Sequence, residues 1–271
     1  MKLWKAHGLG NDYLVWEESA ISLDARMVQK ICHRTKGVGG DGILEPHSSS
    51  TAEYGVRIWN PDGSIAEKSG NGLRIFAHWL HTKKGAPIRF RIDTGACVVG
   101  AEILHESISI DMGRAYWEST EIPTNERIWK KPYQVGSEDF LLYAVGVGNP
   151  HCVALFDADQ SLDELPWRVW GAHLECDLRF PNRTNVQFAA VRSRGDIEIR
   201  IWERGAGETS ASGSSSCAVA AVAHRLGLVD GEITMHMTGG ILQVSIDEQG
   251  EICLIGPVEE VGSCILHSRF F

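Results

Sequence analysis

The chain has 271 residues, of which 43% are hydrophobic and 23% are charged, and its formal net charge is −9. This length allows one large domain or two of about 130 residues, each able to bury its own core. A negative charge without any basic stripe argues against nucleic acid or an anionic membrane as a partner.

The first half of the chain predicts several strands around one long helix. A short helix capped by Ser22 and ending near Gly37 comes first, and a longer one runs from about Asn71 to Gly85. The segment 37–42 matches the letters GxGxxG. A dinucleotide-binding motif needs a strand before it and a helix after it, whereas here a helix precedes and a strand follows, so we reject a dinucleotide site. Strands are expected within 3–16 around a turn at 7–12, and at 43–45, 57–60, 88–94, 97–104 and 107–112.

The second half repeats this plan. The stretch 113–140 is polar and contains two prolines, so we expect it to cross between domains. A short helix near 162–170 is interrupted at Pro166, and a long helix runs from about Ser214 to Leu226. Strands clustered around one long helix per half indicate an α+β fold. They are expected at 141–147, 185–191, 196–202, 233–237, 242–246 and 252–255, with a turn at 148–151.

A duplicated stretch relates the two halves. Arg57-Ile58-Trp59 and Ser69-Gly70 recur 143 residues later as Arg200-Ile201-Trp202 and Ser212-Gly213. Each copy aims a Ser-Gly turn at a helix N-terminus, where unpaired N–H groups and the helix dipole favour an anion. Small residues let a ligand approach this backbone closely. Serine also caps ordinary helices, so it is the duplication that favours a shared ligand site.

The seven cysteines are widely spaced and include no CxxC pair. This pattern fits reduced thiols in the cytosol better than a disulfide framework. The N-terminal residues lack the apolar region of a signal peptide, and no run reaches the roughly 18 apolar residues of a membrane span. We therefore expect a cytoplasmic protein with no membrane partner.

Polar side chains gather at the turns of both halves. Amides suit an amino-acid zwitterion, because they donate to a carboxylate and accept from an ammonium group. Arg204 is able to hold a carboxylate through two hydrogen bonds. Asparagine is common in turns, so only the symmetric set favours a ligand cleft. The set comprises Asn11, Asn60, Asn71, Asn149, Asn185, His151, Glu203, Arg204 and Glu208. His78 and His81 lack a third ligand, so no metal is expected.

Five motifs spread over both halves form a specific combination. They are 7–13 (HGLGNDY), 37–42 (GVGGDG), 60–64 (NPDGS) with 69–74 (SGNGLR), 148–151 (GNPH) and 203–209 (ERGAGET). Together they resemble the diaminopimelate epimerase family over nearly the whole chain. The resemblance implies two pseudo-symmetric domains, each a mostly antiparallel sheet wrapped around a central helix. We place the two domains at 1–117 and 118–258, and we expect the tail 259–271 to return to the N-terminal half.

The resemblance also implies an activity. The family inverts a Cα centre without a cofactor, with the active site between the domains. One residue removes the proton and a second residue on the opposite face returns one. A homodimer is implied as well. In this chain Ser69 and Ser212 occupy the two proton-transfer positions, and His151 and Glu203 assist them. Contacts with a small amino-acid substrate are implied for Asn11, Asn60, Gly70, Asn71, Asn149, Asn185, Arg204, Gly213 and Ser214.

This chain departs from the family pattern at those two positions, where the family has catalytic cysteines. Gly42 also stands where Gln is usual, and Ser214-Ser215 where Thr-Gly is usual. A serine hydroxyl is a far weaker acid than a thiol and needs a partner to act as a base. An engineered Cys→Ser pair and natural divergence both explain the serines, and the altered neighbours favour divergence.

Three functions follow as hypotheses. The first is an epimerase of diaminopimelate or a similar zwitterion. The second is an isomerase of a biosynthetic intermediate, similar to the phenazine-biosynthesis type, in which His151, Glu203 or Glu208 moves the proton. The third is a binding protein that kept the cleft and lost the chemistry.

Overall fold

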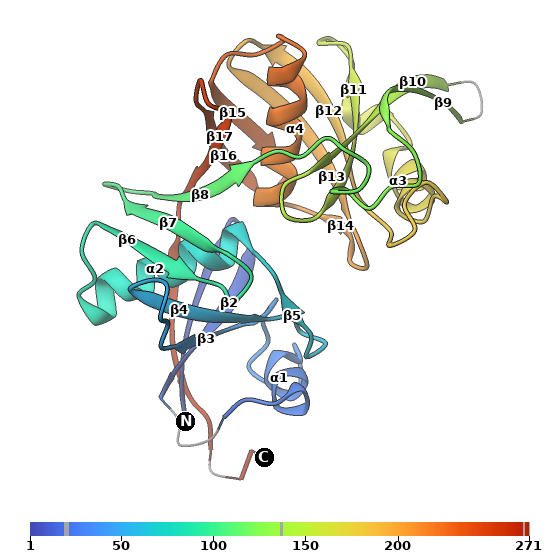
Figure 1. Cartoon of the computed structure of the whole chain (residues 1–271). Helices are drawn as coiled ribbons and strands as arrows, with labels where there is room; N and C mark the ends of the chain where they lie inside the picture. The colour runs from blue at the N-terminus through green and yellow to red at the C-terminus, as the bar shows by residue number, and fades with distance from the viewer. Residues whose placement is uncertain (19–21, 136–137, 268, 271) are drawn as a thin grey trace. The chain divides into compact units, whose positions relative to one another are not determined.

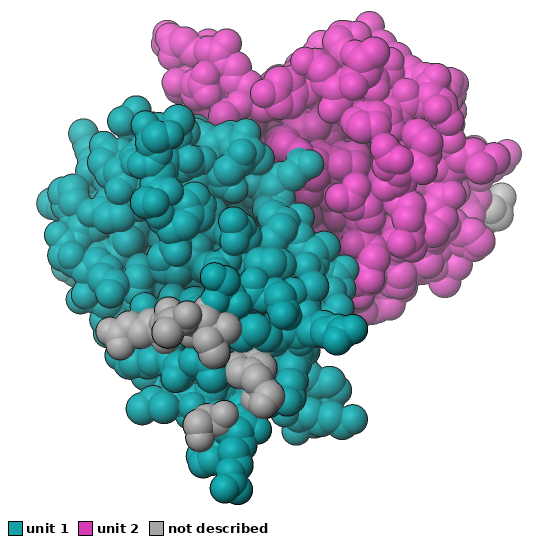
Figure 2. All heavy atoms as spheres, turned by 60° about the horizontal axis from the view of Figure 1, so that its bottom comes forward, with its two compact units in different colours: residues 1–111, 256–271 teal, residues 112–255 magenta. Residues whose placement is uncertain are grey.

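The structure is a computed structural model that describes residues 1–18, 22–135, 138–267 and 269–270. The chain forms two compact units (Figure 2). Unit 1 comprises residues 1–111 and 256–271, and unit 2 comprises residues 112–255.

Unit 1 is built from strands around the helix α2 (Figure 1). Its helices are α1 (Ala25–Cys32) and α2 (Gly70–Lys84). Its strands are β1 (Lys2–Gly8), β2 (Asn11–Glu18), β3 (Ile43–His47), β4 (Tyr54–Trp59), β5 (Ile65–Ala66), β6 (Arg89–Asp93), β7 (Val98–Ile103), most of β8 (Ile108–Arg114) and β18 (Glu259–Ile265).

Helix α2 is the centre of unit 1. It begins at the N-cap Ser69 and ends at Gly85, whose φ of 72° is the left-handed conformation that glycine adopts without strain. All of its residues from Gly70 to Ala77 are buried, and it packs against β1, β2 and β7. A helix buried on every side must be surrounded by protein. The helix expected from about Asn71 to Gly85 is confirmed.

Unit 2 is built in the same way around α4 (Gly213–Arg225), which contacts β15 and β16 (Figure 1). Small apolar side chains, mostly Ala and Val, let the surrounding strands approach this helix closely. Its other helices are the 3₁₀ turn η1 (Leu162–Glu164) and α3 (Trp167–Glu175). Its strands are β9 (Trp129–Val135), β10 (Glu138–Gly146), β11 (Pro150–Phe156), β12 (Asn185–Ser193), β13 (Asp196–Glu203), β14 (Gly207–Thr209), β15 (Glu232–Met237), β16 (Gly240–Ile246) and β17 (Glu251–Gly256).

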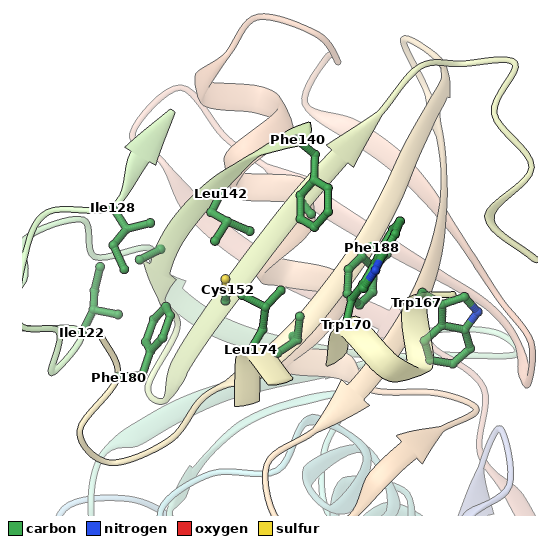
Figure 3. Packing of buried hydrophobic residues seen from close by; sticks show 13 residues of the cluster. Ile122, Ile128, Phe140, Leu142, Cys152, Trp167, Trp170, Leu174, Phe180 and Phe188 are labelled. Carbon is green, nitrogen blue, oxygen red and sulfur yellow. The ribbon is translucent and has the colours of Figure 1, made fainter. Parts of the chain in front are cut away.

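An aromatic cluster joins α3 to the sheet of unit 2 (Figure 3). The ring centroid of Phe140 lies 5.1 Å from that of Trp170, and Phe188 lies 6.1 Å from Trp170. Such tilted pairs add to the free energy gained by burying the rings. The cluster therefore fixes α3 on strands β10 and β12.

The same strand pairings, in the same register, occur within each of the two units. Pairings in unit 1 reappear in unit 2 with both partners shifted by the same 143 positions seen in the sequence. The parallel pairings β4–β6 and β13–β15 correspond as well. Matching pairs are Ile43↔Trp59 with Val186↔Trp202, Ile58↔Ala66 with Ile201↔Thr209, and Tyr54↔Ile92 with Ile197↔Met235. The prediction of two pseudo-symmetric, mostly antiparallel sheets around central helices is confirmed.

Several local predictions are wrong. Asp24, not Ser22, caps α1, because its carboxylate accepts from the Met27 N–H at 2.8 Å, and the helix already ends at Cys32. The stretch 113–140 contains β9 and the start of β10, because its Lys and Pro residues hid the strand alternation. By contrast, the interruption expected at Pro166 is confirmed, because η1 ends at Glu164 and α3 begins at Trp167.

Five strands of the described residues were not predicted, namely β5, β9, β11, β14 and β18. Strand β11 starts at Pro150, inside the expected turn, and β18 lies in the tail, where its Cys264 pairs with Leu3 of β1. None of the seven cysteines, all of which lie in the described ranges, forms a disulfide. Over the described ranges, no helix is long and apolar enough to span a membrane.

Candidate active site

The Ser69 turn of unit 1 places a hydroxyl at the start of α2. Ser69 Oγ accepts a hydrogen bond from the Gly72 N–H at 3.1 Å. The Tyr13 hydroxyl, which comes from β2, lies 3.0 Å from the same oxygen. Ser69 is half-buried and Tyr13 is buried. The serine hydroxyl thus has a phenol partner as well as the positive end of a helix dipole.

A chain of hydrogen bonds fixes the amides beside Ser69. Arg74 donates to Asn71 Oδ1 at 2.7 Å, and Asn71 Nδ2 donates to Asn11 Oδ1 at 3.0 Å. Asn11 Nδ2 in turn donates to Asp41 at 2.9 Å. The Arg74 guanidinium is completely buried, so its charge lies inside the unit below this turn. The structure therefore brings Asn11 and Asn71 together above the buried Arg74, beside the Ser69 turn.

The ion pairs of Asp12 hold the adjacent loop. Burial raises the pKa of the Asp12 carboxyl, but hydrogen bonds from Arg34 and Lys5 outweigh burial, so the pKa lies below its usual value. Lys5 Nζ lies 2.7 Å from Asp12 Oδ2, and Arg34 also bridges Asp12 to Asp41. Asp12 is thus an ionised anchor for the loop that holds Asp41.

Asn60 belongs to a different turn. Its side-chain amide donates to Ser64 Oγ at 3.0 Å, and its backbone N–H donates to the Ser64 carbonyl. Asp62 accepts from the Ser64 N–H at 2.8 Å inside the same turn. Asn60 is therefore not part of the chain that joins Asn11 to Arg74.

Gly42 has no room for a side chain. A Cβ atom built there would lie 2.4 Å from the Trp59 carbonyl oxygen and 2.5 Å from Cε1 of the Tyr13 ring. The ring that carries the Tyr13 hydroxyl toward Ser69 thus occupies the space beside Gly42. A glutamine at this position is incompatible with that arrangement.

The Ser212 turn of unit 2 has the backbone geometry of the Ser69 turn. Ser69 has φ −140° and ψ 114°, and Ser212 has φ −145° and ψ 123°. Unlike Ser69, Ser212 makes no side-chain capping bond, and its carbonyl accepts from both the N–H and the hydroxyl of Ser216. Gly213 is buried and Ser214 is half-buried in the first turn of α4. The backbone is therefore repeated, whereas the surroundings of the hydroxyl differ.

His151 lies at the centre of a buried network in unit 2. Its Nε2 is 2.7 Å from Asn149 Oδ1, and its Nδ1 is 3.0 Å from Gln187 Nε2. Burial lowers the pKa of His151 to about 3, so the imidazole is neutral at physiological pH. His151 therefore contributes hydrogen bonds here and not a positive charge.

Asn185 ties two parts of unit 2 together. Its amide nitrogen donates to the Pro150 carbonyl at 3.0 Å, and its oxygen accepts from the Arg204 N–H at 3.0 Å. The Arg204 side chain is exposed, and Glu203 beside it is half-buried. The backbone of Arg204 is thus held beside the strand that carries His151.

Glu208 is engaged elsewhere. Its two carboxylate oxygens accept from Arg168 at 2.6 and 2.7 Å, and this pair lowers the pKa of Glu208. A proton-transferring carboxylate needs a pKa raised toward the working pH, so this pairing disfavours Glu208 in that role.

Sequence reasoning missed Tyr13, Arg74, Gln187 and Ser215. For Tyr13 the signal lies in the strand register of the structure and not in the sequence. In the parallel pairings next to each central helix, Leu14 pairs with Ile43 and Cys152 pairs with Val186, so Tyr13 corresponds to His151. No signal in one sequence pointed to the buried hydrogen bonds of the others.

The predicted absence of a metal site was argued from His78 and His81. His78 Nε2 lies 3.0 Å from Glu260 Oε1, and His81 Nδ1 bonds the Ala86 carbonyl at 2.7 Å. Within the described ranges, no group of three or more His, Cys, Asp or Glu residues is arranged to hold a metal ion.

Comparison with known proteins gives concordant results over the whole chain. The family described as Diaminopimelate epimerase matches residues 3–118 and 143–261. A relative named Diaminopimelate epimerase 2 from Nostoc sp. is 40% identical over 280 residues, covering 100% of this chain and 97% of that protein. A Diaminopimelate epimerase from Pelotomaculum thermopropionicum is 37% identical, covering 97% and 98% of the two chains.

Solved structures share the fold at lower identity. A phenazine biosynthesis protein of the PhzF family from Bacillus anthracis superposes with a TM-score of 0.71 at 16% identity, covering 98% of this chain and 99% of that one. A hydroxyproline epimerase from Agrobacterium vitis gives 0.68 at 15% identity, covering 97% and 91%. With its family match, its relatives and its repeated Ser-Gly turns, the chain belongs to the diaminopimelate epimerase family.

Proposed function

We propose that this protein is an epimerase that inverts a Cα centre of diaminopimelate or of a similar zwitterionic amino acid. The observation that carries the proposal is the repeated Ser-Gly turn, which has one backbone geometry at the start of both buried helices in a chain of this family. In this proposal Ser69 and Ser212 are the two proton-transfer residues, one of which removes the Cα proton while the other returns a proton. His151 and Glu203 assist them.

Proton transfer through serine requires activated hydroxyls. A free serine hydroxyl is a weak base and a weak acid, so neighbouring groups must shift that balance. At Ser69 these groups are the Tyr13 hydroxyl and the N-terminus of α2. The Gly72 N–H on Ser69 Oγ stabilises negative charge on that oxygen. Ser212 lies at the corresponding end of α4.

The substrate contacts follow from the same set of polar groups. The Asn11–Asn71 chain and the N–H groups of the two helix starts offer donors to carboxylates, and Arg204 offers a bidentate donor. We assign substrate binding to Asn11, Asn60, Gly70, Asn71, Asn149, Asn185, Arg204, Gly213 and Ser214. We further propose that the enzyme is a cytoplasmic homodimer and works without a cofactor.

Isotope exchange tests the proposal directly. The protein is incubated in heavy water with LL- or meso-diaminopimelate, and with other amino acids, and deuterium at Cα is measured by mass spectrometry. Incorporation that depends on Ser69 and Ser212 supports epimerisation. Absence of exchange with every amino acid tried rejects it. Tight binding without exchange assigns the protein to substrate binding alone.

The presence of serine at both proton-transfer positions supports a second candidate function. Because neither proton-transfer position has a thiol, a carboxylate-driven isomerase on the same fold is the alternative, with Glu203 as the proton carrier. The neutral state of His151 makes Glu203 the stronger candidate of the two assisting groups.

A further inference from the structure

The partners of His151 allow its neutral ring only one tautomer. An amide nitrogen donates and does not accept, so Gln187 Nε2 makes His151 Nδ1 the acceptor at 3.0 Å. An amide oxygen only accepts, so Asn149 Oδ1 requires a proton on His151 Nε2, 2.7 Å away. A neutral imidazole with its proton on Nε2 satisfies both contacts at once. A second proton on Nδ1 would face the Gln187 donor.

Gln187 is itself anchored by Ser215. The same amide nitrogen donates to Ser215 Oγ at 3.0 Å, and both side chains are completely buried. The Gln187 Oε1 atom is buried and accepts no hydrogen bond from any described residue. With the amide turned around, this oxygen would accept from the Ser215 hydroxyl, and it would accept from His151 only if the ring proton moved to Nδ1. The orientation of Gln187 and the tautomer of His151 are therefore coupled.

The fold does not require polar residues at the positions of Gln187 and Ser215. At the positions 143 residues earlier, which share the strand register, unit 1 has Leu44 and Gly72. A Cβ atom on Gly72 would lie 3.2 Å from Cδ2 of Leu44, so the two are in direct apolar proximity. A buried amide oxygen without a hydrogen bond lowers the stability of the folded state, and the apolar pair in unit 1 has no such oxygen. Unit 2 bears this cost at the place where Gln187 reaches His151.

We propose that Gln187, anchored by Ser215, is a positioning residue that holds His151 as the neutral Nε2–H tautomer. His151 in turn holds the Asn149 amide by its oxygen, so that the amide nitrogen is presented to a substrate carboxylate. The Asn149 oxygen faces His151, so the amide nitrogen is the group presented to a ligand, and a donor selects a carboxylate over an ammonium group. The binding of a substrate carboxylate by Asn149 rests on the proposed function. The assignment of the His151 tautomer is independent of that function.

Nitrogen NMR of histidine-labelled protein tests the tautomer without any need for turnover. The His151 signals, assigned by their loss in His151→Gln, should show a protonated Nε2 and a bare Nδ1 between about pH 5 and pH 9. Gln187→Glu replaces the donor by an acceptor and should move a proton to Nδ1. A wild-type ring protonated on Nδ1, or one that titrates like a free histidine, overturns the proposal.

Substrate kinetics test the second step. Gln187→Leu, which copies Leu44, should raise KM at least about tenfold and lower kcat less, because orientation of a binding group is lost. Ser215→Ala should raise KM by a smaller factor. Gln243→Leu, an exposed change on β16, is the control and should leave both constants unchanged. Thermal unfolding confirms that each variant is folded.

The outcomes separate the two proposals. An unchanged KM in folded Gln187→Leu overturns the positioning role, whatever the reaction is. If wild-type protein exchanges no amino-acid proton, the proposed function fails. The NMR result then still decides whether Gln187 sets the tautomer of His151.

Discussion

The Tyr13 hydroxyl lies 3.0 Å from Ser69 Oγ, whereas His151, at the corresponding place of unit 2, bonds Asn149 and Gln187. The two units thus share a backbone but surround their serines with different chemistry. A phenol adjoins one hydroxyl, and a neutral imidazole network lies in the other unit. If these serines carry protons, kcat and KM can each differ between the two directions, whereas the equilibrium constant fixes the ratio of the two kcat/KM values.

Removal of the Tyr13 hydroxyl should impair proton transfer at Ser69. We expect Tyr13→Phe to lower kcat about tenfold, because one hydrogen bond to the reacting oxygen is lost. Initial rates of deuterium incorporation, measured from each stereoisomer, check this expectation.

The matched control is Tyr54→Phe in the same unit, where the ring packs edge-on against Phe90. This variant should keep its activity. Equal rates for wild type and Tyr13→Phe would show that Tyr13 serves only to fill space.

A side chain at Gly42 should destabilise unit 1. We expect Gly42→Ala to lower the free energy of unfolding by about 1–3 kcal/mol, because its Cβ would lie 2.4 Å from the Trp59 carbonyl. Urea unfolding measures the difference. Gly100→Ala is the control, since its Cβ would meet only Asp111 Cβ at 3.6 Å. Comparable losses in both variants would refute the packing account.

The buried imidazole of His151 should make stability depend on pH. Burial lowers the folded-state pKa of His151 to about 3 from the ordinary 6.5, so below pH 6.5 the unfolded chain binds the proton first. Stability from this group is complete above pH 6.5. It falls by up to about 1.4 kcal/mol per pH unit on acidification toward pH 3.

Denaturation curves between about pH 5 and pH 8 avoid most carboxylates, and comparison with His151→Gln separates this histidine from the other ten. In His151→Gln the slope over that range should shrink by the same amount. An unchanged slope would mean that His151 does not titrate on unfolding in this way.

Restoring thiols at the two proton-transfer positions should increase epimerisation. A thiolate forms far more readily at a helix N-terminus than an alkoxide does, so Ser69→Cys with Ser212→Cys should raise the exchange rate by more than about tenfold. The assay uses diaminopimelate in heavy water. A lower rate would indicate that the pocket has become specific for hydroxyls.

Alanine at both serines separates the two candidate reactions. If the serines carry the protons, Ser69→Ala with Ser212→Ala abolishes exchange, and Glu203→Gln only slows it. The carboxylate-driven isomerase predicts the opposite order. Glu208→Gln should change the exchange rate little in either case, because the Glu208 carboxylate is paired with Arg168. Single-turnover measurements on the three variants give the order.

Much of the fold could be predicted because it depends on local patterns. The long helices were predicted from about Asn71 to Gly85 and from about Ser214 to Leu226, since capping residues and apolar spacing are local signals. Strands β9 and β11 escaped detection, because Lys131, Pro132 and Pro150 weaken strand signals although neighbouring strands still pair with them. Tertiary pairing overrode local propensity in both cases.

The amino-acid sequence alone determined the family, the duplication and the two serines at corresponding helix starts, because these are properties of residue order. Only the tertiary structure decided which side chains surround each serine. The Tyr13 contact joins residues 56 positions apart, and the Gln187–His151 contact joins residues 36 apart. Such contacts depend on strand register and burial, which a linear sequence does not reveal. The same burial makes His151 neutral, and this state decides what chemistry the site is able to perform.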